Sequence, residues 1–210
     1  MKYKVMIVED QTMPRELFEL RVQASERFEL ALSIDNAALA DVYCLRFPVD
    51  LILMDVITRD GENGLDAAAR IKRAFPQIKI IIVTSMPECS YLKRAKEIGV
   101  ESFWYKEEQR ESLLDVMERT MNGESVYPGA SPELTLGMAS SCQFTERELD
   151  ILREITSGDT NQEIADRLNM SVATVKTHIL NMLEKTGFRN RTELAVRARE
   201  SGLVILNRRN

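Results

Sequence analysis

The stretch VDLILMDVITRDGENG, residues 49–64, places a short apolar run directly before an acid. Leu51–Met54 is continuously apolar, which is typical of a parallel strand that is buried on both faces. Asp55 follows at once, and turn-forming residues come after it. In an open parallel sheet, ligands bind beyond the carboxyl ends of the strands. The pattern therefore predicts that a buried strand carries Asp55 to the rim of a binding site.

Outward from this stretch, the first 122 residues alternate between strand-like and helix-like segments. Such alternation predicts an α/β doubly wound five-stranded parallel sheet with helices on both faces. The other runs that we expect to be strands are Tyr3–Val8, Phe28–Ile34, Ile78–Val83 and Ser102–Tyr105, and the expected helices are Arg15–Ser25, Ala37–Phe47, Leu65–Phe75, Ser90–Ile98 and Arg110–Met121.

Polar side chains follow four of these strands. Glu9 and Asp10 follow the first, Asp55 the third, Thr84 the fourth and Lys106 the fifth. Each would be ordinary alone, but the carboxyl ends of parallel strands meet at one edge, so we expect these side chains to converge. Three carboxylates in one place repel each other, and a hard divalent cation such as Mg²⁺ would relieve the repulsion. The site could then form an acyl phosphate, with Asp55 as nucleophile, Lys106 pairing one phosphoryl oxygen and Thr84 hydrogen-bonding another.

Four segments together resemble a response-regulator receiver domain over nearly all of residues 1–122. They are VED (8–10), LILMDV (51–56), IIIVTS (80–85) and SFWYK (102–106). The resemblance implies that a sensor histidine kinase supplies the phosphoryl group to Asp55. The loop Thr58–Asn63 lacks the Met-Pro pair that is usual in receivers and is one residue longer. The resemblance further implies a Mg²⁺ site made by Glu9, Asp10, Asp55 and the main-chain carbonyl of Ile57, and a switch made by Thr84 and Phe103.

Residues 123–143, GESVYPGASPELTLGMASSCQ, break the alternating pattern. Gly, Pro and Ser cluster there without periodicity, which predicts an interdomain linker. We expect residues 144–207 to form a second, small all-α domain. The charge of the chain is uneven, because residues 1–122 carry 17 basic and 21 acidic side chains whereas residues 161–210 carry nine and five. The basic end favours a polyanionic partner.

Two short helical patterns in the second domain surround a tight turn. They are Asn161–Leu168 and Val172–Lys185, and Ser171 is placed to cap the second. This arrangement predicts a helix-turn-helix whose second helix enters the major groove of DNA. On its outer side we expect Thr174, Lys176, Thr177, Leu180 and Asn181 to contact bases or phosphates, with Lys185, Arg189 and Arg191 beside the phosphates. A four-helix bundle with a solvated polar face is the other interpretation.

The stretch TNQEIADRLNMSVATVKTHILNMLEKTG, residues 160–187, closely resembles a LuxR-type DNA-binding domain. Together with TERE at 145–148, the resemblance covers about sixty residues. It implies a recognition helix Val172–Leu183 in which Lys176 contacts DNA. A receiver, a linker and a LuxR-type domain in this order are typical of the NarL/FixJ class of transcriptional response regulators. That class implies a double-stranded DNA operator as partner and a homodimer formed on phosphorylation or DNA binding.

The leading hypothesis is a two-component response regulator in which phosphorylation of Asp55 controls DNA binding and transcription. One alternative is a DNA-binding regulator whose receiver dimerises without phosphorylation. Another is an aspartyl-phosphate phosphohydrolase, which fits less well because Ile57 stands where such enzymes carry a second Asp. We expect no enzyme activity beyond self-phosphorylation and self-dephosphorylation at Asp55.

Targeting signals are not evident in the sequence. No apolar stretch reaches the roughly 18 residues needed to cross a bilayer, and the N-terminus lacks the pattern of a signal peptide. We therefore expect a cytoplasmic protein without a membrane partner. Cys44, Cys89 and Cys142 are far apart and form no metal-binding pair, so we expect free thiols, which suit a reducing compartment.

Overall fold

The computed structural model describes residues 2–59, 63–86, 89–106, 111–129 and 133–204. These residues form two compact units. The first unit contains the described residues of 2–85 and 91–129, and the second contains Met86, Cys89, Ser90 and the described residues from 133 onward.

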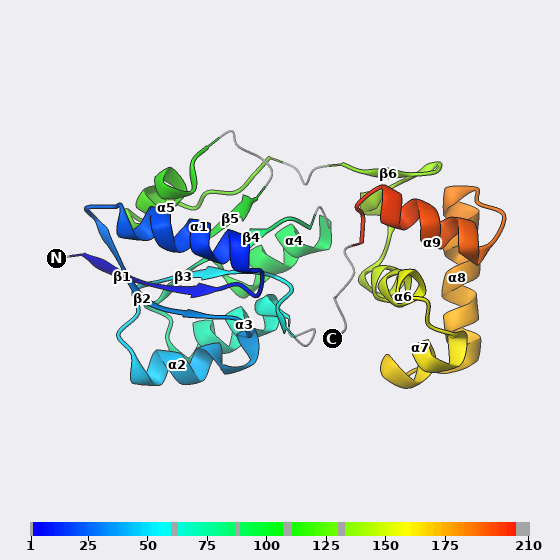
Figure 1. Ribbon diagram of the computed structural model, residues 1–210, viewed down its shortest axis with the longest axis horizontal. Helices are drawn as coiled ribbons and strands as arrows, with labels where there is room; N and C mark the ends of the chain where they lie inside the picture. Colours follow the sequence, from blue (N-terminus) through cyan, green and yellow to red (C-terminus); the bar gives the residue numbers. More distant parts are fainter. Residues whose placement is uncertain (1, 60–62, 87–88, 107–110, 130–132, 205–210) are drawn as a thin grey trace. The chain divides into compact units, whose positions relative to one another are not determined.

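The first unit is built on a five-stranded sheet in the order β2-β1-β3-β4-β5, in which every neighbouring pair is parallel (Figure 1). The prediction of a doubly wound α/β fold is confirmed. The expected start of the last helix at Arg110 lies outside the described residues. The elements are β1 Tyr3–Val8, α1 Thr12–Gln23, β2 Phe28–Ile34, a 3-10 helix Ala37–Leu39, α2 Ala40–Arg46, β3 Leu51–Met54, α3 Gly64–Ala74, β4 Lys79–Thr84, α4 Cys89–Ile98, β5 Ser102–Tyr105 and α5 Leu113–Met121.

Helices cover both faces of this sheet. Phe18 and Val22 of α1, and Val116 and Met117 of α5, pack against alternate residues of the strands on one face. Figure 1 shows α2 and α3 below the opposite face. All four residues of β3 are fully buried. Each such side chain contributes about 1.5–3 kcal/mol by leaving water, so the strand that ends at Asp55 is held firmly.

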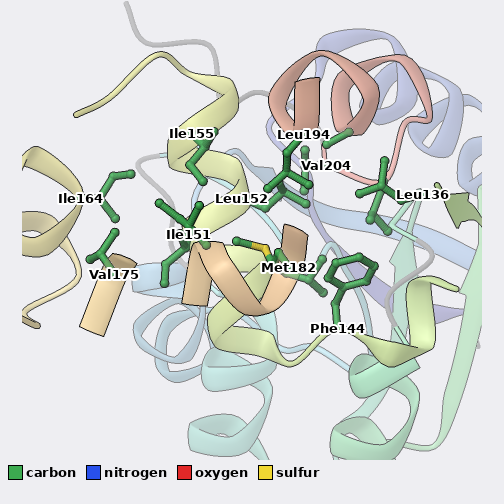
Figure 2. Packing of buried hydrophobic residues seen from close by; sticks show 14 of the residues in the cluster. Leu136, Phe144, Ile151, Leu152, Ile155, Ile164, Val175, Met182, Leu194 and Val204 are labelled. Atoms are coloured by element: carbon green, nitrogen blue, oxygen red, sulfur yellow. The ribbon is translucent and has the colours of Figure 1, made fainter. Parts of the chain in front are cut away.

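The second unit is helical except for a small hairpin. Its elements are β6 Thr135–Leu136, β7 Ala139–Ser140, a 3-10 helix Ser141–Gln143, α6 Glu146–Thr156, α7 Asn161–Arg167, α8 Val172–Thr186 and α9 Arg191–Glu200. Figure 2 shows their shared core, which includes Phe144, Leu152, Ile164, Met182 and Leu194. The fold prediction is confirmed for this unit as well.

Part of the stretch that we predicted to be a linker is folded into the second unit. Leu136 and Ala139 are buried in its core, and the Met138 N–H donates to the carbonyl of Thr186. A Cβ on Gly137 would lie 2.2 Å from that same carbonyl oxygen, so only glycine fits. Strands of two residues leave no periodic pattern, which is why the sequence reads as a loop there.

The cysteines differ from expectation at one position. Cys44 is a free, buried cysteine, whereas Cys142 is bonded in a disulfide. The expectation of a free thiol is therefore wrong for Cys142. Among the described residues, no helix combines the length and the apolar character that a membrane span requires.

Candidate functional site

Three carboxylates meet at the carboxyl ends of β1 and β3. One oxygen of each of Glu9, Asp10 and Asp55 lies within 4.8 Å of the others. The strands bring them together because β1 and β3 are parallel neighbours and the Asp55 N–H donates to the carbonyl of Val8 at 2.9 Å. Glu9 is fully buried and Asp55 is 4% exposed. The structure thus brings together the acidic residues that the sequence predicted to converge.

Lys106 completes this pocket from the end of β5. Its ammonium lies 2.8 Å from Oδ2 of Asp55 and 2.5 Å from Oε2 of Glu9. The Lys106 N–H donates to the carbonyl of Thr84, which ties the ends of β4 and β5 together. The other oxygen of Asp55, Oδ1, accepts from the N–H of Val56 at 2.7 Å. Asp55 is therefore oriented by one cation and one main-chain donor.

The three carboxylates can carry more negative charge than the ammonium of Lys106 offsets. Burial raises the pKa of the Asp55 carboxyl from 3.8 to about 7, with Lys106 opposing the rise and Glu9 adding to it. Burial also raises the pKa of Asp10. Hard carboxylate oxygens around a partly open position are the donors that Mg²⁺ prefers. The residues present fit a Mg²⁺ ion, which would neutralise the surplus charge.

Ile57 was predicted to add a main-chain carbonyl to this site. It lies two residues after Asp55 and pairs with Asn63 in an isolated antiparallel bridge. The bridge closes the base of the loop whose middle, residues 60–62, lies outside the described part of the chain. The metal-binding role of Ile57 therefore stays a prediction.

The loop after Asp55 is fastened to the segment after β2. Thr58 is 1% exposed, and its hydroxyl accepts from the N–H of Ala37 at 3.0 Å. Arg59 pairs with Asp35 through both its main chain and its guanidinium, the latter at 2.7 Å. These contacts hold Thr58 and Arg59, at the start of the longer loop, against the segment after β2.

Gly64 is a site residue that our sequence analysis did not identify. A Cβ at this position would lie 1.8 Å from the main-chain oxygen of Asp55. The Gly64 N–H also donates to the carbonyl of Val56 at 2.7 Å. The one signal in the sequence was an Asn-Gly pair at the start of a helix, where Asn63 caps α3.

Thr84 and Phe103, the predicted switch residues, are both buried. Thr84 is fully buried at the end of β4, and Phe103 is 1% exposed on β5. The ring of Phe103 packs against Tyr105 with centroids 5.0 Å apart and against Tyr127 at 6.3 Å. Their role as a switch remains a prediction.

In the second unit, α7 and α8 surround a tight turn. Asn169 adopts a left-handed conformation with φ of 53°, and Ser171 caps α8 by accepting from the N–H of Thr174. Side chains of Val175, Ile179 and Met182 face the core. The five base-contact candidates, Thr174, Lys176, Thr177, Leu180 and Asn181, are all exposed on α8.

Two predicted phosphate contacts have partners inside the unit. The Lys185 ammonium lies 2.6 Å from Glu148, whose side chain is 3% exposed, and also donates to the carbonyl of Gln143. The guanidinium of Arg191 donates to Asn161 and to the carbonyl of Asp159, at the start of α7. Arg189, the third candidate, is exposed. The sequence did not reveal Glu148 as the partner of Lys185, because 37 residues separate the two.

Two protein-family models match the chain. The response regulator receiver domain matches residues 5–118, and the luxR family of bacterial regulatory proteins matches residues 142–198. Among curated relatives, the response regulator proteins VraR of Staphylococcus epidermidis and of Staphylococcus aureus are each 32% identical over 212 residues. These alignments cover 97% of this chain and 100% of each relative.

Solved structures with the same fold include other response regulators, one of them bound to DNA. A structure of two RcsB dimers bound to two parallel DNAs has a TM-score of 0.57 and 17% identity, and covers 95% of this chain and 98% of that one. The response regulator ChrA of a heme-sensing two-component system has a TM-score of 0.52 and 21% identity, and covers 97% and 99%. At such identity these likenesses concern the fold. Together with the family models and the VraR relatives, they show that the chain belongs to the two-component response regulators that join a receiver domain to a LuxR-type DNA-binding domain.

Proposed function

We propose that Asp55 accepts a phosphoryl group from a sensor histidine kinase and that this phosphorylation controls binding to a double-stranded DNA operator. The observation that carries the proposal is the pocket itself. Three carboxylates lie within 4.8 Å of one another, and the ammonium of Lys106 lies 2.8 Å from Asp55. A buried acid with a raised pKa beside a single cation is a frequent feature of reactive sites.

The chemistry follows from how Asp55 is held. A carboxylate oxygen of Asp55 forms the new bond to phosphorus, and the bond from phosphorus to the histidine nitrogen breaks, leaving its electron pair on the imidazole. Mg²⁺, held by Glu9, Asp10, Asp55 and the carbonyl of Ile57, would supply charge neutralisation for the phosphoryl oxygens. Lys106 would pair with one of these oxygens, and the hydroxyl of Thr84 would donate to another. Hydrolysis of the acyl phosphate by water would return Asp55 to its starting state.

The proposed DNA contacts centre on the exposed side of α8. Lys176 can reach a guanine edge or a phosphate, Thr177 and Asn181 can hydrogen-bond base edges, and Leu180 can contact a thymine methyl group. Leu180 is 60% exposed, so its side chain is accessible for such a contact. We retain Thr174 and Arg189 as further contacts. We leave Lys185 and Arg191 out of the interface, because using them would break contacts inside the unit.

Dimerisation and location complete the proposal. RcsB forms dimers on DNA in a solved structure of the same fold, and two copies of α8 would read two half-sites of one operator. We therefore propose that this chain forms a homodimer on phosphorylation or DNA binding. We also propose that it acts in the cytoplasm, where a bacterial operator is accessible.

A labelling experiment tests the first step. Wild type and Asp55→Asn are incubated with acetyl phosphate and Mg²⁺, and intact mass is measured. We expect one added phosphoryl group on wild type and none on the variant, and equal labelling of both would remove Asp55 from its role. Selection of DNA from a random pool, with and without acetyl phosphate, would then identify the operator. Selection of the same DNA with equal affinity in both arms would favour a regulator that acts without phosphorylation.

A further inference from the structure

The first unit continues beyond α5 into residues 124–127, which we name the strap. Gly123, with φ of 95°, turns the chain at the end of the helix. Glu124 is then fixed by two contacts with Arg119: its N–H donates to the Arg119 carbonyl at 3.0 Å, and its carboxylate accepts from Nε at 2.8 Å. The strap therefore starts from a defined position on α5.

The strap runs beside β5, the last strand of the sheet. The Phe103 N–H donates to the carbonyl of Val126 at 2.8 Å, and the Val126 N–H donates to the hydroxyl of Ser102 at 3.1 Å. The Ser102 hydroxyl lies 2.7 Å from that of Thr120, which in turn donates to the carbonyl of Val116. Ser102 and Thr120 are fully buried. In this series of hydrogen bonds each hydroxyl donates to the next acceptor. Moving the strap would leave buried polar groups without hydrogen-bond partners, which costs free energy.

Tyr127 ends the strap and packs on the predicted switch residue. Its ring lies 6.3 Å from that of Phe103, at an angle of 33°. Its hydroxyl donates to the carbonyl of Val100 at 2.7 Å, and the ammonium of Lys96 lies 5.0 Å from its ring centroid. Burial raises the pKa of the Tyr127 phenol, so the hydroxyl stays protonated and able to donate. Three elements, α4, β5 and the loop between them, thus hold one side chain.

We infer that Tyr127 is a positioning residue that couples the state of Asp55 to the chain leading into the DNA-binding unit. The inference rests on the proposed function of Asp55. Lys106 contacts Asp55 directly and comes immediately after β5, three residues beyond Phe103, so a change at the pocket shifts the end of β5. Phe103 touches the strap twice, through its N–H and through its ring. If the Phe103 ring leaves its buried position, Tyr127 loses the ring it packs against, and the strap is held less firmly.

The test measures coupling in the full-length protein. For one selected operator, the dissociation constant is determined with and without beryllofluoride and Mg²⁺, and the ratio of the two constants is the coupling. For wild type we expect a ratio within about 5 to 150, the usual range for allosteric coupling. Tyr127→Leu, which keeps apolar volume but removes the ring and the hydroxyl, should lower the ratio to less than a third of the wild-type value. Tyr127→Phe should retain most of it, because the ring remains.

A matched control separates coupling from stability. Tyr3 also packs against a phenylalanine, Phe28, with ring centroids 6.1 Å apart, but far from Lys106 in the order of strands. Tyr3→Leu should leave the ratio unchanged even if it lowers the melting temperature. The double variant Phe103→Leu with Tyr127→Leu should lose no more coupling than the stronger of the single variants, because the two residues act in one path.

The outcomes distinguish the two proposals. If wild type responds to beryllofluoride and Tyr127→Leu responds equally, Tyr127 has no role in coupling while the proposed function stands. If wild type shows no response, phosphorylation control fails and the inference fails with it. Asp55 labelling by acetyl phosphate should proceed in Tyr127→Leu as in wild type, and a loss of labelling would show damage to the pocket, which also contradicts a role confined to coupling.

Discussion

Replacing Asp55 with asparagine should stabilise the protein at alkaline pH in the absence of Mg²⁺. The side chain is almost fully buried, and burial together with the nearby Glu9 raises its pKa from 3.8 to about 7 despite Lys106. The folded state therefore binds more protons than the unfolded state between about pH 4 and pH 7. The contribution of Asp55 to the free energy of unfolding therefore falls as the pH rises through this window, and its loss is complete above it. Asparagine does not titrate, so the variant escapes this loss.

The pKa shift sets the size of the effect. A rise of about three pKa units corresponds to about 4 kcal/mol, at 1.36 kcal/mol for each unit. This value is an upper limit, because the titration of Asp55 is coupled to the charges of Glu9 and Lys106. We expect the difference in unfolding free energy between variant and wild type to grow by about 2–4 kcal/mol from pH 4 to pH 8. The ion pair with Lys106 needs no separate correction, because it forms only when Asp55 is ionised and already limits the rise of the Asp55 pKa. Saturating Mg²⁺ should abolish most of this growth.

Urea denaturation followed by tryptophan fluorescence provides the assay. Trp104 is the one tryptophan of the chain and lies on β5, so its emission reports on the receiver unit. Glu29→Gln, which alters an exposed carboxylate on β2, serves as the control and should show no growth of this kind. A difference between Asp55→Asn and wild type that stays flat across the pH range would refute the reasoning. The reasoning would also be refuted if this difference in unfolding free energy grew with pH to the same extent in saturating Mg²⁺.

Three further predictions concern single residues. Gly64→Ala should lower the unfolding free energy of the receiver unit by about 3 kcal/mol or more and slow the labelling of Asp55, because the new methyl group would overlap the Asp55 carbonyl; normal labelling and stability would show that the loop can move aside. Lys185→Met should destabilise the second unit by about 2–4 kcal/mol, since it leaves Glu148 buried without its cation, while DNA affinity measured well below the melting temperature stays within about twofold. Lys176→Ala should instead lower DNA affinity by about five- to tenfold without a change in melting temperature. If gel-shift and melting experiments show that Lys185→Met weakens DNA binding and Lys176→Ala lowers the melting temperature, the roles of the two lysines are exchanged.

The sequence predicts the receiver fold well because most of its strands are continuous apolar runs that end at polar or turn-forming residues. β1, β2, β3 and β5 begin and end where the apolar runs do, and β4 is shifted by one residue. The acidic pocket is predictable for the same reason, since parallel strands carry their end residues to one edge. Gly64 was not predictable, because its importance depends on a close approach to the Asp55 carbonyl that no pattern encodes.

The helix-turn-helix shows a different limit of sequence analysis. The caps and the buried face of α8 follow from local patterns, and exposure agrees with the expected outer side. Lys185 and Arg191 look equally suited to bind phosphates in the sequence. Their partners, Glu148 and Asn161, come from distant helices, and so the choice between an internal ion pair and a DNA contact depends on packing.

The folded parts on either side of the predicted linker restrict how phosphorylation can act. The strap holds the chain to the receiver as far as Tyr127, and the Leu134 N–H is already bonded to the Ser141 hydroxyl of the second unit. Along the main chain, residues 128–133 join the two. Six residues reach at most about 20 Å when fully extended, less than a third of the span of a free 21-residue linker. As long as the strap stays bound, the connecting main chain is therefore shorter than the predicted linker. If regulation begins at Asp55 as we propose, release of the strap is one way for it to act, because a free strap lengthens the connection by four residues, or roughly 13 Å.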